Sequence, residues 1–351
     1  MRRQDPLIIG AGPAGCAAAI TLAQGGARPL IVERHHETGD ALCGGFISWQ
    51  TIRRLENLGV DVRGHRITRL RLFAGGHTAE APLPEPGFGL SRRVMDQALM
   101  KAAQAAGAGL ERGITIRHRD EVASHAPALF LATGKYDLKG LERPRKATDP
   151  TLGLRVRLPA TPSLSRLIAD SIELHLFDRG YAGVELQEDG SANICLAVRK
   201  SRLAEAGRDP AALLLQLAQE HPQLGERLAG FSAQLPLDAI AAVPYGWRQT
   251  HDPHGAYRLG DQCAVIPSLA GEGNGIALAS GVSAARAYLG GQSPASWQHH
   301  FAGATRRPVG LATLLWHLAE HPTPQKLAVR LLGALPFWAG LLARATRITV
   351  A

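Results

Sequence analysis

Three glycines near the N-terminus have the spacing of a phosphate-binding turn. Gly10, Gly12 and Gly15 follow the apolar run at 7–9 and precede an alanine-rich stretch at 16–23. The first glycine allows a sharp turn, the second lets a pyrophosphate approach the backbone, and the third lets a helix pack closely on a strand. The free N–H groups of that helix start attract a phosphate, and Pro13 and Ala14, which lie there, are expected beside it. The pattern predicts a dinucleotide site, and an ordinary strand–turn–helix unit is the alternative.

An acidic residue at the expected distance strengthens this interpretation. The second apolar run, 30–32, ends in Glu33, which comes 18 residues after Gly15 and is followed by Arg34. A carboxylate at the end of the second strand can accept hydrogen bonds from the ribose of an adenosine. The elements that must position these residues are therefore a strand, a tight turn, a helix and a second strand.

A second glycine-rich region lies near the other end of the chain. Gly260 and Asp261 follow a short strand pattern, and a GEGNG sequence opens a predicted helix at 276–289; its residues that we expect at the cofactor are Gly271, Gly273, Asn274 and Gly275. A carboxylate at Asp261 can bind a ribityl hydroxyl. The helix start directs N–H groups at a ligand that becomes negative, which fits a reduced flavin.

Length and composition indicate a globular chain of about two domains. The 351 residues include four scattered cysteines and a net charge of +9, from 39 basic and 30 acidic side chains. The cysteine usage is typical of a reducing compartment, and Arg2-Arg3 precede a glycine turn instead of an apolar export signal, so we expect a cytoplasmic protein. The basic residues form no patch interleaved with aromatic residues, so we expect no nucleic-acid partner. An anionic cofactor or an incidentally basic surface would each explain the charge.

The hydrophobic pattern changes along the chain and predicts an α/β fold. Residues 1–150 and 248–295 have the alternating strands and helices of a discontinuous Rossmann-type FAD domain, whereas 151–247 contains strands typical of an antiparallel substrate-binding sheet. The hairpin sequence Glu188-Asp189-Gly190 separates two of those strands. Residues 296–351 are expected to form a helical cap.

At this point the chain resembles the FAD-dependent superfamily of geranylgeranyl reductases and para-hydroxybenzoate hydroxylase-type monooxygenases, from the N-terminus to about Gly291. The resemblance implies that the N-terminal glycines, Glu33 and Arg34 hold the ADP half of FAD. It implies the same role for Arg92, which starts an Arg-x-x-x-Asp motif with Asp96. The Gly-Asp pair corresponds to the family's ribityl motif. The GEG motif, Ser280-Gly281 and the sequence Cys43-Gly44-Gly45 are similar to the reductase branch, in which the cysteine lies near the isoalloxazine.

Two departures from the family patterns leave the reaction open. Hydroxylases of the family carry Asp-Gly where this chain has Thr133 and Gly134, which we still place at the cofactor. The reductases carry YxWxFP where this chain keeps only Tyr181. The resemblance therefore favours an FAD-dependent monooxygenase of a lipophilic or aromatic, polyketide-like molecule, with NAD(P)H as the electron donor. A reductase of carbon–carbon double bonds is the alternative, and a non-catalytic flavin-binding module recruited to a membrane is a more distant one.

Three residues are candidates for contact with the flavin or the substrate. Cys43 is a candidate through the CGG resemblance, although buried cysteines are usually inert. Pro267, with Ser268 beside it, precedes the flavin-side helix, and a plain turn is the alternative. Tyr181 could orient a substrate through its hydroxyl or could be an ordinary sheet tyrosine.

Arginines and histidines supply weaker candidates. Arg155 and Arg157 share a strand face and could meet an anionic substrate or could simply be solvated. His317, Glu320 and His321 spell HxxEH, but no third ligand is in view, so no metal site is expected.

The C-terminal segment is strongly apolar. Residues 327–342 include LLGALPFWAGLL, which is too short and too interrupted by Pro336 for a spanning helix. It could cap the substrate cavity, which we favour, or lie peripherally at the inner face of a membrane and admit a lipophilic substrate. No obligate protein partner is expected.

Overall fold

Five short strands form a parallel sheet in the computed structural model, which describes residues 6–122, 128–144, 147–251 and 255–349. The strands are β1 (Leu7–Ile9), β2 (Leu30–Glu33), β6 (Gly109–Arg112), β7 (Leu129–Leu131) and β13 (Ala256–Arg258), in the order β13-β7-β1-β2-β6. The inner strands β1 and β7 are apolar because a parallel sheet is covered on both faces, whereas the edge strand β6 is partly exposed and contains Glu111 and Arg112. Strand β7 pairs in parallel with β1.

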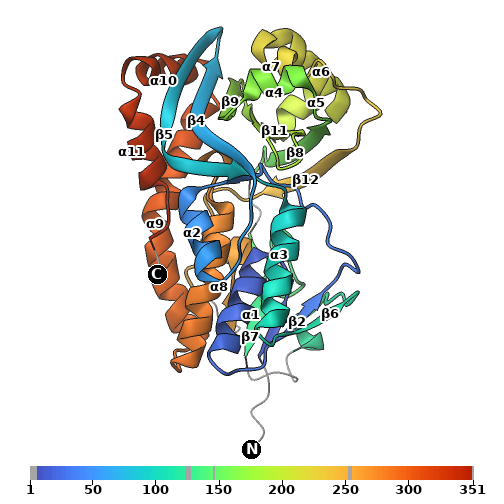
Figure 1. Cartoon of the computed structure of the whole chain (residues 1–351), viewed down its shortest axis with the longest axis vertical. Coiled ribbons are helices and arrows are strands. Elements are labelled where there is room, and N and C mark those ends of the chain that lie inside the picture. The colour runs from blue at the N-terminus through green and yellow to red at the C-terminus, as the bar shows by residue number, and fades with distance from the viewer. Residues whose placement is uncertain (1–5, 123–127, 145–146, 252–254, 350–351) are drawn as a thin grey trace, which may run out of the picture.

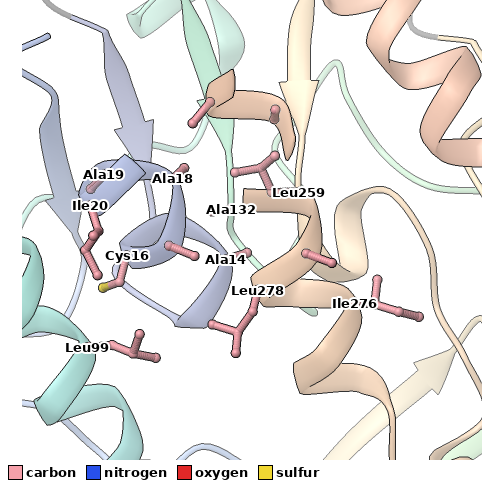
Figure 2. Packing of buried hydrophobic residues seen from close by; sticks show 14 of the residues in the cluster. Ala14, Cys16, Ala18, Ala19, Ile20, Leu99, Ala132, Leu259, Ile276 and Leu278 are labelled. Carbon is pink, nitrogen blue, oxygen red and sulfur yellow. The ribbon is translucent and has the colours of Figure 1, made fainter. Parts of the chain in front are cut away.

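Helix α1 (Pro13–Gln24), which is rich in alanine, packs on this sheet. Helices α3 (Arg92–Ala105) and α8 (Gly273–Leu289) pack on α1, and α2 (Trp49–Asn57) packs on α8. A Cβ at Gly281 of α8 would lie 2.3 Å from the carbonyl oxygen of Ala14, so α1 and α8 approach to backbone contact. Figure 2 shows α1 between α3 and α8, with Leu99 of α3 on one side and Leu278 of α8 on the other. This close packing fixes where α1 and α8 begin.

A second sheet of eight strands lies above the first in Figure 1. Its strands are β3 (Phe46–Ile47), β4 (His65–Ala74), β5 (His77–Gly89), β8 (Thr151–Leu158), β9 (Ser171–Phe177), β10 (Gly180–Leu186), β11 (Ala192–Arg199) and β12 (Leu237–Val243), in the order β12-β8-β11-β10-β9-β4-β5-β3. The predicted hairpin is present as β10 and β11.

Two features of this sheet differ from the expectation. It is mixed and not purely antiparallel, because β4 pairs with β9 in parallel. It also takes three strands from residues 46–89, which we had grouped with the cofactor domain. The long β4–β5 hairpin can join it because β4 leaves one edge free to pair with β9, which arrives from a segment about a hundred residues later.

Further helices flank the second sheet on two sides (Figure 1). One group consists of α4 (Pro162–Ile168), α5 (Lys200–Glu205), α6 (Pro210–Glu220) and α7 (Pro222–Arg227), whose leucines form a core with β8, β10 and β11. The C-terminal group consists of α9 (Pro294–Ala319), α10 (Pro322–Ala334) and α11 (Phe337–Ala345), and α10 and α11 pack on β4 and β5. The expected helical C-terminus is confirmed.

No single helix of the described residues is long and apolar enough to cross a membrane. The pair α10 and α11 meets the length and composition criteria together, but a bend of 116° separates the two helices.

Candidate functional site

One large cavity lies between the two sheets and collects most of the residues that the sequence singled out. Its volume is about 1380 Å³. The predicted site residues on its wall are Gly10, Gly12, Pro13, Ala14, Glu33, Arg34, Cys43, Gly44, Gly45, Arg92, Thr133, Gly134, Tyr181, Gly260, Asp261, Gly271, Gly273 and Asn274. Residues from both ends of the chain therefore meet in one place.

Three predicted site residues lie off this wall. Gly15 packs α1 against β1, because a Cβ there would be 2.0 Å from the carbonyl oxygen of Gly10. Gly275 faces Glu272, whose Oε1 would be 2.4 Å from its Cβ. Pro267 precedes a short turn whose Ser268 reaches the wall instead. These positions shape the site without facing it.

Both helices that begin at the cavity lack a side-chain cap. Gly12, which precedes α1, has no side chain to cap it, and the side chain of Glu272, which precedes α8, accepts no hydrogen bond from its helix. By contrast, Ser48, Ser91 and Ser293 cap α2, α3 and α9. Uncapped N–H groups that face a cavity are available to an anionic ligand. The two helix starts thus provide two positive ends.

The space before Gly12 fits a pyrophosphate. A Cβ at this residue would project into the cavity, where the nearest atom is an Arg92 guanidinium nitrogen at 3.7 Å. Gly10 has φ +103°, and its own Cβ would be 2.5 Å from the carbonyl oxygen of Ala132, so only glycine suits the turn. The glycine roles that we expected from the spacing match this geometry.

Glu33, which we expect at the ribose of the adenosine, is held in place by hydrogen bonds from the backbone. Both oxygens of Glu33 accept backbone N–H groups, Oε2 from Ala11 at 2.9 Å and Oε1 from His35 at 3.0 Å. The guanidinium of Arg34 lies 3.6 Å from the ring centroid of Tyr136. The carboxylate retains lone pairs for a ribose, and the stacked arginine and tyrosine form a flat wall beside it.

Arg92 is held rigidly beside the same space. It donates to both oxygens of Asp96, at 2.9 and 2.8 Å, one turn along α3. Burial raises the pKa of Asp96, and the adjacent guanidinium opposes that rise. A buried bidentate pair fixes the cation where phosphate oxygens would lie.

The CGG loop meets the start of α8. The Cys43 sulfur accepts from Asn274 Nδ2 at 3.7 Å and from Gly45 N at 3.5 Å. The Cys43 carbonyl accepts from Asn193 of β11 at 3.2 Å. Cys43 therefore connects the CGG loop with α8 and with the second sheet.

The guanidinium groups of Arg155 and Arg157 are paired with carboxylates of the protein and not directed at a substrate. Arg155 donates to Asp40 at 2.9 Å and to Asp238, and Arg157 donates to Asp40 at 2.6 Å. Arg155 also donates to the carbonyl of Ala41, two residues before the CGG loop. The two arginines anchor this loop to β8 and β12, which the alternation of the strand could not reveal.

The glutamate of the GEG motif also has a structural partner. Glu272 is fully buried and accepts from Arg347 at 2.7 Å, from Ile348 N at 3.3 Å and from Ser48 at 3.4 Å. Arg347 also donates to the carbonyls of Ala270 and Gly271. The C-terminal segment therefore holds the start of α8 in place, and no sequence pattern identified Arg347.

A cluster of hydroxyl groups lies on the cavity wall. The hydroxyls of Tyr181 and Tyr245 both form hydrogen bonds with Ser268 Oγ, and the distance from the Tyr245 hydroxyl is 2.6 Å. Burial raises the pKa of Tyr181 well above its usual value and that of Tyr245 to about 12. Both phenols are neutral at pH 7 and can donate to a polar group of a substrate. Tyr245 was missed because its VPYGW context carries no periodic signal.

Much of the remaining wall is apolar. It includes Leu70, Leu72, Ile172, Leu174, Leu176, Leu196, Val243, Leu269, Leu315, Leu318, Leu331, Leu332, Leu335, Trp338 and Leu342. Apart from Leu269 and Leu335, these residues come from the second sheet and from α9, α10 and α11. Gly183 of β10, where the reductase pattern has tryptophan, also lies on this wall. Burial raises the pKa of its neighbour Cys195 to about 12, so that thiol stays protonated.

No metal centre emerges from the described residues. They contain no group of three or more His, Cys, Asp or Glu side chains that could hold a metal ion. In the HxxEH sequence, both oxygens of Glu320 accept from Arg199, at 2.8 and 2.7 Å.

A buried carboxyl group lies behind the CGG loop. Glu185 of β10 is fully buried, and no described residue forms a hydrogen bond of normal geometry with either of its oxygens. Burial raises the pKa of Glu185 well above its usual value, and Cys43 adds to the rise. The sequence signal for it was an acid inside an otherwise apolar strand.

From the buried carboxyl group of Glu185 we predict an unusual dependence of stability on pH. Because the folded pKa lies above the unfolded one, the folded state binds the extra proton, and stability falls as pH rises between the two values. The free energy of unfolding should fall by about 1.4 kcal/mol per pH unit in that interval. Glu185→Gln should abolish this fall and be the more stable protein at neutral pH. Urea unfolding of the FAD-loaded protein between about pH 5 and pH 8 measures it.

The half-buried Glu85, which is paired with Arg53 at the surface, provides the matched control, because Glu85→Gln should leave the pH profile of the wild type unchanged. Parallel profiles for the wild type and Glu185→Gln would contradict the prediction.

Comparisons with known proteins agree with an FAD site in this cavity. Residues 3–136 match the family model of the FAD binding domain. Over 137 residues, the chain is 31% identical to the chloroplastic geranylgeranyl diphosphate reductase of Nicotiana tabacum, a match that covers 38% of this chain and 29% of that one. It is 27% identical to the menaquinone reductase of Mycolicibacterium smegmatis, covering 95% of this chain and 92% of that one.

Solved structures share the fold across nearly the whole chain. A geranylgeranyl bacteriochlorophyll reductase-like protein from Thermoplasma acidophilum has a TM-score of 0.73 at 19% identity, covering 98% of this chain and 96% of its own. A flavin-dependent brominase also has a TM-score of 0.73, at 14% identity, covering 98% of this chain and 93% of its own.

Proposed function

Because this chain belongs to the FAD-dependent oxidoreductase superfamily of geranylgeranyl reductases and para-hydroxybenzoate hydroxylase-type monooxygenases, we propose that it reduces a carbon–carbon double bond in a long isoprenoid-like lipid. The observation that carries the proposal is the aliphatic wall of the cavity, which runs from the second sheet to α11. A long hydrocarbon chain gains free energy when it leaves water for such a surface. FAD supplies two-electron transfer when bound.

The chain's own residues have defined tasks in this proposal. The helix starts at Gly12 and Glu272 and the guanidinium of Arg92 hold the phosphates and polar edge of FAD. The hydroxyls of Tyr181 and Tyr245 orient a polar group of the substrate, and the aliphatic wall excludes water from the reacting bond. NAD(P)H is the donor that we propose.

Oxygenation is the second candidate. The neutral hydroxyl cluster at Ser268 could equally hold the ring hydroxyl of an aromatic substrate, which favours a monooxygenase of a lipophilic or aromatic molecule. The sequence alone favoured this reaction. The aliphatic lining favours the first candidate, because a flat ring would leave much of the cavity unfilled.

Mass analysis of the product separates the two reactions. The FAD-loaded protein is reduced under nitrogen and mixed with menaquinone or geranylgeranyl diphosphate as probes. Re-oxidation of the flavin, with the gain of two hydrogens by the isoprenoid chain of the probe after any quinol has been returned to the quinone in air, supports reduction of a carbon–carbon double bond. The absence of any re-oxidation under nitrogen, with incorporation of labelled oxygen into a product in air, would overturn reduction in favour of oxygenation. Bleaching of flavin absorbance by NADH or NADPH tests the donor.

A charge at one position of the wall should disfavour a long hydrocarbon substrate. Gly183 has ordinary backbone geometry, and its Cβ would meet only Cys195 O at 3.7 Å and Leu174 Cδ2 at 3.9 Å. Gly183→Asp should therefore fold and keep FAD but lower kcat/KM for a long-chain substrate by a factor on the order of ten or more, because the substrate would have to displace water from a carboxylate. Gly303→Asp on the exposed side of α9 is the control. Unchanged kcat/KM in Gly183→Asp would show that the substrate does not occupy this wall.

A further inference from the structure

Exposed apolar side chains gather on the C-terminal helices. We define the apolar rim as Leu314, Leu318, Leu327, Leu331, Leu335, Phe337, Trp338 and Leu341, which are all between 43% and 62% exposed. They recur at helical spacing of four on α9 and α10, and Phe337 and Leu341 do so on α11. Scattered exposed leucines are ordinary, but a cluster of eight on three adjoining helices indicates an interaction surface.

The rim is continuous with the cavity. Four of its members, Leu318, Leu331, Leu335 and Trp338, also line the cavity wall. The same side chains therefore face the interior space on one side and solvent on the other. An apolar molecule could pass between the cavity and whatever covers the rim without crossing water.

The C-terminal segment that carries the rim is basic, and the acidic residues of the adjoining strand β5, Glu80 and Glu85, are paired with arginines. Residues 273–351 contain seven basic side chains and a single acidic one, Glu320, which is buried against Arg199; the basic residues are Arg286, Arg306, Arg307, Lys326, Arg330, Arg344 and Arg347. Of these, Lys326, Arg330 and Arg344 belong to the two helices that carry most of the rim. Such a combination of apolar and basic residues matches a surface that is apolar within and anionic at its boundary.

We propose that the apolar rim docks on the surface of a bilayer that contains anionic lipids, so that the cavity opens directly to the membrane. Phe337, Trp338 and Leu341 insert among the lipid chains, while Arg330 and Arg344 lie at the level of the phosphates. The α10–α11 pair, bent by 116°, lies in the interface and does not cross the bilayer. This surface goes beyond the proposed reaction, since docking requires no turnover.

Vesicle flotation with the FAD-loaded protein tests the docking. The wild type should float with vesicles of phosphatidylglycerol and phosphatidylcholine, less with phosphatidylcholine alone, and less as salt is raised. The variant Phe337→Asp/Leu341→Asp, at two rim residues that do not line the cavity, should bind anionic vesicles more weakly by a factor on the order of ten or more.

Leu215→Asp is the matched control. Leu215 is 51% exposed on α6, in the group of helices on the other side of the second sheet in Figure 1, so this variant should float like the wild type. Flavin content and the unfolding midpoint confirm that each variant is folded. Absence of flotation by the wild type, or equal flotation of both variants, would overturn the proposal.

Light scattering tests whether a second copy of the chain, instead of a membrane, covers the apolar rim. A wild-type dimer that dissociates in the Phe337→Asp/Leu341→Asp variant, with no binding to vesicles, would assign the rim to self-association and overturn membrane docking. Reduction of a detergent-dispersed probe is measured separately, so failure of the reaction and failure of docking are distinguishable.

Discussion

Arg347→Met should lower the free energy of unfolding by about 3–5 kcal/mol. The Arg347 and Glu272 side chains are 4% and 0% exposed, and the guanidinium also donates to two backbone carbonyls that precede α8. Removing the cation leaves a buried carboxylate without its charge partner. Because Glu272 immediately precedes α8, the same change should weaken FAD binding. Urea unfolding and titration of the apoprotein with FAD measure the two effects.

Two further variants make this prediction specific. The double variant Glu272→Gln/Arg347→Met removes both charges and should recover at least about 1 kcal/mol relative to Arg347→Met alone. The exposed Arg344, in the same C-terminal segment, gives the control, and Arg344→Met should change stability by less than about 0.5 kcal/mol. If the double variant were no more stable than Arg347→Met, the unpaired charge would not be the cause of the loss.

Gly12→Ala and Gly15→Ala should separate FAD binding from folding. Gly12 has φ −74° and ψ −176°, which alanine adopts readily, and its new methyl group would enter only the cavity. The apoprotein should unfold at nearly the wild-type urea concentration. FAD affinity should fall about tenfold to a hundredfold, because the methyl group occupies the place of the pyrophosphate.

Gly15→Ala should affect both properties. Its Cβ would lie 2.0 Å from the carbonyl oxygen of Gly10, so α1 must move away from β1. Such overpacking costs about 1–3 kcal/mol, and the displaced helix start no longer faces the ligand. Gly303→Ala, with no atom within 4 Å of the new methyl group, serves as the control for both variants. Wild-type FAD affinity in Gly12→Ala would show that the pyrophosphate binds elsewhere.

The sequence predicted the cofactor side of the cavity in detail. The turn at Gly10, the helix start after Gly12 and the strand ending in Glu33 lie within one short stretch of chain. Their geometry depends on local backbone conformations and on the absence of a Cβ, which residue types state directly.

The substrate side was predicted only in outline. The strands of the second sheet were recognised, but the pairing of β4 with β9 was not, because strand partners are chosen by packing between distant segments. The strand face of Arg155 was read correctly, yet its partners Asp40 and Asp238 come from elsewhere in the chain. A charge pattern gives the position of a side chain but not what it meets.

By itself, the sequence determined that this chain binds FAD at a Rossmann-type turn, because that site is built from contiguous residues with restricted backbone geometry. Only the tertiary structure decided what surrounds the rest of the cavity. Tyr181 meets Ser268 across 87 positions and Arg347 meets Glu272 across 75, and Glu185 is buried by a loop 140 residues earlier. Such contacts depend on how two sheets and the C-terminal helices pack, a free energy to which many distant residues each contribute a small part.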